Sequence, residues 1–152
     1  MTKVVSLLRH EAELVVRFRA TLLREQEALR SGRTDGLTEI NAEKLALVES
    51  LNLAVAERVR ILSSGNESTI DMAAWFAAHP METHSLVVWN KLLEIARETR
   101  AINEENGGLI NALQQKTNDA LSILTLGQVN QSLYGSNGQA APSTGSRVID
   151  SA

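Results

Sequence analysis

The first thirty residues read MTKVVSLLRHEAELVVRFRATLLREQEALR, and a stripe that recurs in alternating steps of four and three residues runs through them. The stripe consists of Val4, Leu8, Glu11, Val15, Phe18, Leu22, Glu25 and Leu29. This spacing is that of a coiled-coil seam, in which one face of a helix points steadily at a partner helix. Further apolar residues widen the stripe, as packing inside a bundle requires: Val5, Leu7, Leu14 and Leu23. The stretch therefore predicts a long helix in a coiled-coil-like bundle.

A second helix of the same kind is predicted after a short break. Turn residues occupy positions 31–36, and residues 63–66 (Ser-Ser-Gly-Asn) end the second run. Its stripe consists of Leu37, Ile40, Lys44, Leu47, Leu51, Ala54, Arg58 and Ile61. Because so short a connection makes neighbouring helices antiparallel, we expect a long helical hairpin. We expect Phe18 and Leu22 to be largely buried in it, and Lys44 and Arg58 to extend their charged ends to its rim.

Residues beyond the hairpin predict a short helix and then a third long one. Residues 70–79 form the short helix, with Ser68 or Thr69 as its cap and Pro80 as its stop. We expect Trp75 and Phe76 to fill the end of the bundle. The third long helix begins near Thr83 and has the stripe Trp89, Leu92, Ala96, Thr99, Asn103, Asn106, Ile110, Leu113, Thr117, Ala120 and Leu124.

The middle of this third helix is its weakest part. Gly107 and Gly108 each reduce helix stability by about 1 kcal/mol relative to alanine. Just before them, Asn103 and Asn106 have two interpretations. They are polar layers that fix the register of the helices, which we favour, or they mark an opening where a partner helix replaces packing within the chain.

Composition agrees with an all-α fold and excludes several classes of protein. The 152 residues include 3% aromatic residues, nine Gly and two Pro, too few for a sandwich or barrel. A net charge of -3 gives no basic surface for nucleic acid, and the absence of cysteine excludes disulfides and thiolate metal sites. The sequence shows neither a signal peptide nor a stretch apolar enough for membrane insertion, so we expect a cytoplasmic protein.

The C-terminal region has an unusual composition, because no charged residue occurs from Ala120 to Ser146. Its apolar residues are followed by several glycines and Pro142. Such a segment cannot build a core of its own and lacks the charge that keeps a simple linker solvated. We therefore expect a helical bundle domain over residues 1–124 and a flexible, largely uncharged tail over residues 125–152.

Catalytic and metal-binding patterns are missing from the sequence. No Glu stands three residues before His10, His79 or His84, so the Glu-x-x-His pairs of di-iron bundles are absent. Gly107 and Gly108 do not follow a strand and do not form a phosphate loop. The sequence thus predicts no enzyme, no catalytic residue, no cofactor and no metal site.

One short motif resembles a known family. Residues 133–139, Leu-Tyr-Gly-Ser-Asn-Gly-Gln, are similar to the signature near the C-terminus of the flagellar type III export chaperones of the FlgN family. The third helix is similar as well, with Asn103-x-x-Asn106-Gly107-x-Leu109 followed by Ala120-Leu121-x-x-Leu124. In the second helix, the pattern centred on Lys44 resembles the family's hairpin arm. The likeness covers the chain except for residues 63–88.

The resemblance implies a cytosolic chaperone for the hook-associated proteins that join hook and filament. It implies binding to the C-terminal helices of these clients, prevention of premature assembly, and delivery to the cytoplasmic domain of the export gate. The implied client surface consists of Ile110, Leu113, Leu121, Leu124, Leu126 and Val129. The implied gate-docking residues are Leu133, Tyr134, Gly135, Gly138 and Gln139.

Two other hypotheses come from different classes of protein. A structural adaptor would self-associate through its hairpin into a homo-oligomer, with the tail as a linker. A helical-bundle enzyme would need a bound cofactor.

Overall fold

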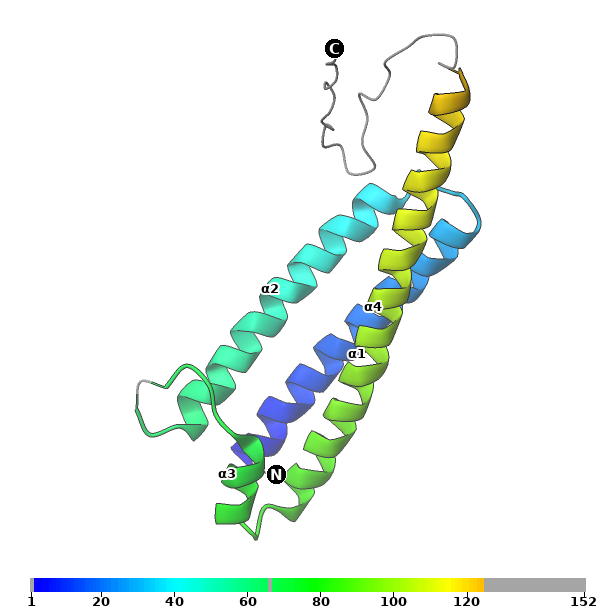
Figure 1. Ribbon diagram of the computed structural model, residues 1–152. Coiled ribbons are helices and arrows are strands. Elements are labelled where there is room, and N and C mark those ends of the chain that lie inside the picture. The colour runs from blue at the N-terminus through cyan, green and yellow to red at the C-terminus, as the bar shows by residue number, and fades with distance from the viewer. Residues whose placement is uncertain (1, 66, 125–152) are drawn as a thin grey trace, which may run out of the picture. The chain divides into compact units, whose positions relative to one another are not determined.

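The computed structural model describes residues 2–65 and 67–124, and within these ranges it contains four helices and no strand. The helices are α1 (Lys3–Arg30), α2 (Leu37–Leu62), α3 (Met72–Ala78) and α4 (Thr83–Leu124) (Figure 1). The predicted all-α fold is confirmed, with long helices in the three expected places and a short helix between the second and third. None of the helices in the described ranges is long and apolar enough to cross a membrane.

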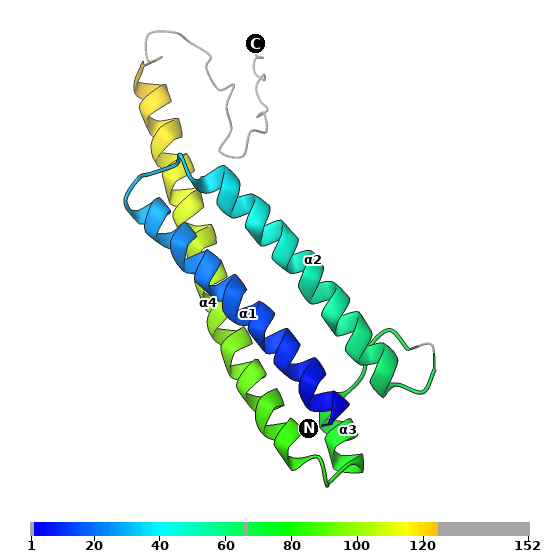
Figure 2. The ribbon, with the colours of Figure 1, turned by 180° about the vertical axis from the view of Figure 1, so that it is seen from behind.

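The chain divides into two compact units, Met1–Asn106 and Gly107–Ala152, and α4 runs from one into the other. The first unit contains α1, α2, α3 and residues 83–106 of α4. Opposite views show α1 lying between α2 and this first part of α4 (Figure 1, Figure 2). In the second unit, the described part is the helical segment 107–124.

Local chemistry determines where α1 begins and how the chain turns into α2. The Thr2 side chain caps α1 by accepting a hydrogen bond from the backbone amide of Val5 at 3.3 Å. At the other end, the Arg33 amide donates to the Ala28 carbonyl at 2.9 Å, around Gly32 with a φ of 70°. This is a Schellman ending, in which glycine adopts the left-handed conformation without a steric penalty. The chain reverses at once, and the expected antiparallel hairpin is confirmed.

The short helix α3 begins at Met72 because Asp71 is its N-cap. An oxygen of the Asp71 carboxylate accepts hydrogen bonds from the amides of Ala73 at 3.0 Å and Ala74 at 3.2 Å. Its negative charge also complements the positive end of the helix dipole. The predicted cap at Ser68 or Thr69 is therefore wrong, whereas the helix does end just before Pro80.

Two apolar clusters form the core of the first unit. The larger one joins α1, α3 and α4 and consists of Val4, Leu8, Val15, Met72, Phe76, Leu92 and Ile95. Phe76 is buried in it, as expected, whereas Trp75 is half-buried against it and stacks on His79 with ring centroids 4.0 Å apart. The smaller cluster consists of Leu14, Leu47 and Ala54 and draws on α1 and α2 alone.

The two residues expected to be buried on α1 differ in their exposure. Leu22 has no exposed surface, which confirms that expectation. Phe18 is half-buried, so its burial is less complete than that of Leu22. Phe18 packs against the smaller cluster.

Candidate functional site

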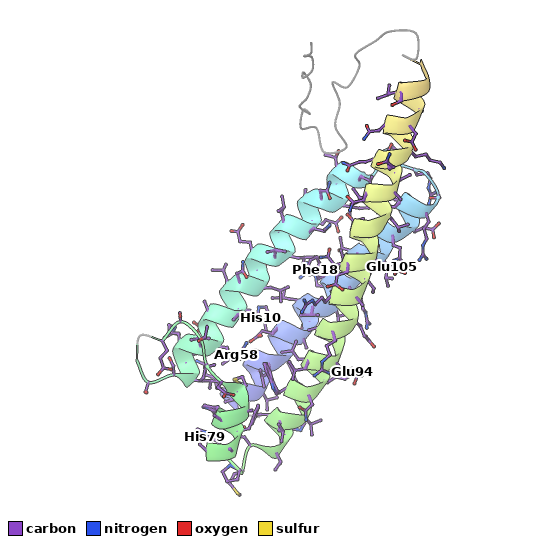
Figure 3. All side chains as sticks on the ribbon, viewed as in Figure 1. His10, Phe18, Arg58, His79, Glu94 and Glu105 are labelled. Atoms are coloured by element: carbon purple, nitrogen blue, oxygen red, sulfur yellow. The ribbon has the colours of Figure 1, made fainter. Side chains whose placement is uncertain are left out.

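A buried ion pair holds the two arms of the hairpin together. The Arg58 Nε atom of α2 donates to the Glu11 Oε1 atom of α1 at 2.6 Å, and both residues are almost fully buried. The Arg58 guanidinium also lies over the Trp89 ring of α4, 5.1 Å from its centroid. Figure 3 labels Arg58, which reaches α1 from α2. One cation thus contacts all three long helices.

A second pair lies further along the same seam. The Lys44 Nζ atom donates to both carboxylate oxygens of Glu25, at 3.0 and 3.2 Å. The expectation that Arg58 reaches the rim is therefore wrong, whereas Lys44 is half-buried. Glu11 and Glu25 lie on the α1 stripe, and a buried carboxylate requires a cation or donors beside it.

The sequence contains a signal for these ion pairs that the periodicity of a single helix does not show. The residue numbers of Glu11 and Arg58 have the same sum as those of Glu25 and Lys44. A constant sum is what the fixed register of an antiparallel hairpin requires. Matching acidic positions of one stripe to basic positions of the other would have located both pairs.

Asn106 connects α4 to α1 at the end of the first unit, where it is 1% exposed. Its Nδ2 atom donates to the Leu22 carbonyl and to the Glu25 Oε1 atom, both at 2.9 Å. Its Oδ1 atom accepts from the Gln26 Nε2 atom at 3.1 Å. Because Glu25 also binds Lys44, this polar cluster joins α1, α2 and α4. The favoured interpretation of Asn106 as a register-fixing layer agrees with these contacts.

The neighbouring polar positions of α4 behave differently from one another. Thr99 is buried, and its hydroxyl donates to the Ile95 carbonyl at 2.7 Å. Asn103 is exposed, so it is not a buried polar layer. Glu105, the residue before Asn106 (labelled in Figure 3), accepts from the Gln26 side chain at 2.7 Å and pairs with Arg30 at 3.4 Å.

Exposed ion pairs on the surface of the hairpin lower the pKa values of two glutamates. Arg24 donates to both carboxylate oxygens of Glu43, at 2.8 and 3.1 Å. This hydrogen bonding lowers the pKa of the Glu43 carboxyl. In the same way, the hydrogen bond from Arg60 lowers the pKa of the Glu57 carboxyl.

The predicted client surface begins in the helical segment 107–124. Ile110 is 37% exposed, Leu121 is 40% exposed, and Leu113 is half-buried. With Thr117 they recur in steps of three and four, which places them on one helical face. The Thr117 hydroxyl donates to the Leu113 carbonyl at 3.0 Å, so its polar group is satisfied within the helix.

The same segment carries little charge. Lys116 and Asp119 are its charged residues, and Asp119 accepts a hydrogen bond from the Gln115 side chain at 2.9 Å. A partner would therefore contact apolar side chains and neutral amides, with no strong field on this helix to steer it.

Several predicted site residues cannot be placed from the structure. Leu124 belongs to α4, but its side chain is not among those described, and Leu126 and Val129 lie outside the described residues. The same holds for all predicted gate-docking residues: Leu133, Tyr134, Gly135, Gly138 and Gln139.

Two of the three histidines, His79 and His84, have structural contacts in the described part of the chain. An Nδ1 atom of His79 lies 2.7 Å from the Trp75 carbonyl, and the His84 ring lies 3.1 Å from the Arg9 guanidinium. Among residues 2–65 and 67–124, no group of three or more His, Asp or Glu side chains could hold a metal ion.

Comparison with known proteins identifies related chains. A family model described as "FlgN protein" matches residues 1–142. Two relatives, from Yersinia enterocolitica and from its serotype O:8 / biotype 1B (strain NCTC 13174 / 8081), are both named "Flagella synthesis protein FlgN". Each is 28% identical over 132 residues, which cover 86% of this chain and 84% of the relative. No solved structure matches.

Proposed function

The chain belongs to the FlgN family, and we propose on that premise that it is an export chaperone of flagellar assembly. A role in making flagella is supported by the name that both relatives carry. In the proposed role, the protein binds C-terminal helical segments of the hook-associated proteins in the cytoplasm. It prevents their premature assembly and delivers them to the cytoplasmic domain of the type III export gate.

The exposed apolar face of residues 107–124 carries this proposal. Ile110 and Leu121 keep more than a third of their surface exposed, and Leu113 lies on the same face. A client helix that is waiting for assembly has an apolar stripe of its own, and helix-in-groove recognition buries such stripes against each other. We assign client binding to this face and to its continuation through Leu124, Leu126 and Val129, and gate docking to residues 133–139.

Calorimetric titration with a synthetic peptide from the C-terminal helix of a hook-associated protein tests the assignment. Ile110→Asp combined with Leu121→Asp should weaken binding at least tenfold, because each new carboxylate would have to be desolvated in the complex. Leu53→Asp on α2 is the matched control, since Leu53 is 67% exposed in the first unit. Equal loss of binding in the control, or none in the double variant, would place the client surface elsewhere.

One observation favours the alternative of a self-associating adaptor. On α2, Leu45 is 72% and Leu53 67% exposed, although the helix already packs against α1. Sedimentation of Leu45→Glu combined with Leu53→Glu decides between the two. A wild-type oligomer that this variant dissociates, together with no client binding, would support the adaptor.

A further inference from the structure

Two glycines inside α4 have no close packing contact with the described residues. Gly107 and Gly108 are both helical, and a Cβ atom added at either position would meet nothing within 4 Å. Glycine in a helix is required where another backbone comes close, and no backbone within residues 2–65 and 67–124 approaches these two glycines in that way. Alanine at both positions would fit and would favour the helix. The two glycines therefore weaken α4 without a compensating contact.

The residue just before them is buried and hydrogen-bonded to the bundle. Asn106 makes three side-chain hydrogen bonds to α1, to Leu22, Glu25 and Gln26. Through Glu25 and Lys44 the same cluster reaches α2. The boundary between the two compact units falls on the peptide bond between Asn106 and Gly107.

From this juxtaposition we propose that Asn106, Gly107 and Gly108 form a border within α4. The helix before the border is stabilised by the bundle, and the helix after it is not. The polar cluster fixes α4 up to Asn106 as part of the bundle. Beyond the glycines, segment 107–124 gains and loses its helix independently of the bundle. This rests on the proposed function in one respect: if that segment binds clients, its helix formation is part of binding, and the two glycines regulate client affinity.

The consequence for binding follows from population arithmetic. For a partner that requires the helical form of the segment, the apparent affinity equals the intrinsic affinity multiplied by the fraction of molecules in which the segment is helical. The glycines lower the helical fraction, so they weaken the complex and favour release. Opening of the segment would leave the bundle intact, because the border isolates it.

Hydrogen exchange of the full-length chain, followed by mass spectrometry, tests the border without any client. In the wild type, protection should drop in one step between residues 106 and 109, rather than decline gradually along α4. Gly107→Ala combined with Gly108→Ala should slow exchange in segment 107–122 by roughly 10- to 30-fold. Gly36→Ala, where an added Cβ also meets nothing, is the matched control and should leave this segment unchanged.

Two results would overturn the border. One is wild-type protection that is equal on both sides of Asn106, and the other is no slowing in the double alanine variant. Titration with the hook-associated peptide then tests the regulation. The double alanine variant should bind more tightly, because the segment is helical in a larger fraction of its molecules, and slowed exchange with unchanged affinity would overturn the coupling. If the peptide binds no variant, the proposed function fails, and the exchange data alone still decide the border.

Discussion

Arg58 and Glu11 form an ion pair in which both residues are buried, with 2.6 Å between the Arg58 Nε and Glu11 Oε1 atoms. Arg58 is 7% and Glu11 3% exposed. Removing two charges from water is costly, and the pair offsets that cost through hydrogen bonds and the Trp89 ring beneath the guanidinium. A contact of this kind specifies how α1, α2 and α4 are aligned.

Arg58→Met should destabilise the fold by about 3–5 kcal/mol, because it leaves the Glu11 carboxylate buried without a partner. Adding Glu11→Leu should recover most of that loss, since both charges are then gone. Denaturant unfolding of the two single variants and the double variant measures the coupling. Arg60→Met, in an exposed pair with Glu57, should change stability by less than about 1 kcal/mol. Additive single effects would contradict the interpretation.

Leu22→Ala should reduce the free energy of unfolding by about 2–5 kcal/mol, because it leaves a cavity at a fully buried position. Its neighbour Leu23 is 46% exposed, so Leu23→Ala should stay within about 0.5 kcal/mol. Phe18→Ala should lie between the two, since the ring is half-buried. Thermal and urea unfolding measure all three, and a small effect of Leu22→Ala would show that this part of the seam is loosely packed.

The Glu43 carboxyl should titrate below its ordinary range, because Arg24 donates two hydrogen bonds to its charged form. A group with a lowered pKa stabilises the fold at pH values above its unfolded-state pKa, and this contribution disappears as the pH falls through the folded-state pKa. Arg24→Gln should raise the Glu43 pKa toward the ordinary value. Carboxyl-carbon NMR titration measures the shift, and Arg60→Gln, which should move Glu57 alone, is the control.

Tyr134→Ala should weaken binding of the client-loaded protein to the export gate's cytoplasmic domain by roughly 2 kcal/mol or more, as for an aromatic hot spot. This prediction follows from the family resemblance of residues 133–139 and lies outside the described residues. Thermal stability and client affinity should stay nearly unchanged. Tyr134→Phe should keep most of the gate affinity if the ring dominates. Destabilisation with intact gate binding would show instead that the tyrosine has a structural role.

Much of the fold could be predicted from short-range patterns. The stripe through Val4, Leu8 and Leu22 determined a long helix, because a repeat of three and four residues has only one compact interpretation. The turn residues at 31–36 determined the hairpin, since so short a connection leaves no other direction for α2. The family itself was indicated by a seven-residue motif that begins at Leu133, independently of any packing.

Only the tertiary structure decided how the polar positions on these stripes are used. Helical periodicity places Lys44, Arg58, Asn103 and Asn106 on the inner faces but does not show what lies across from them. Arg58 is buried against the Glu11 carboxylate, whereas Lys44 binds Glu25 and stays half-buried. Asn106 is hydrogen-bonded to α1, whereas Asn103 is exposed. Burial of a polar group depends on whether a partner is within hydrogen-bond distance, and that distance is set by the packing of separate helices.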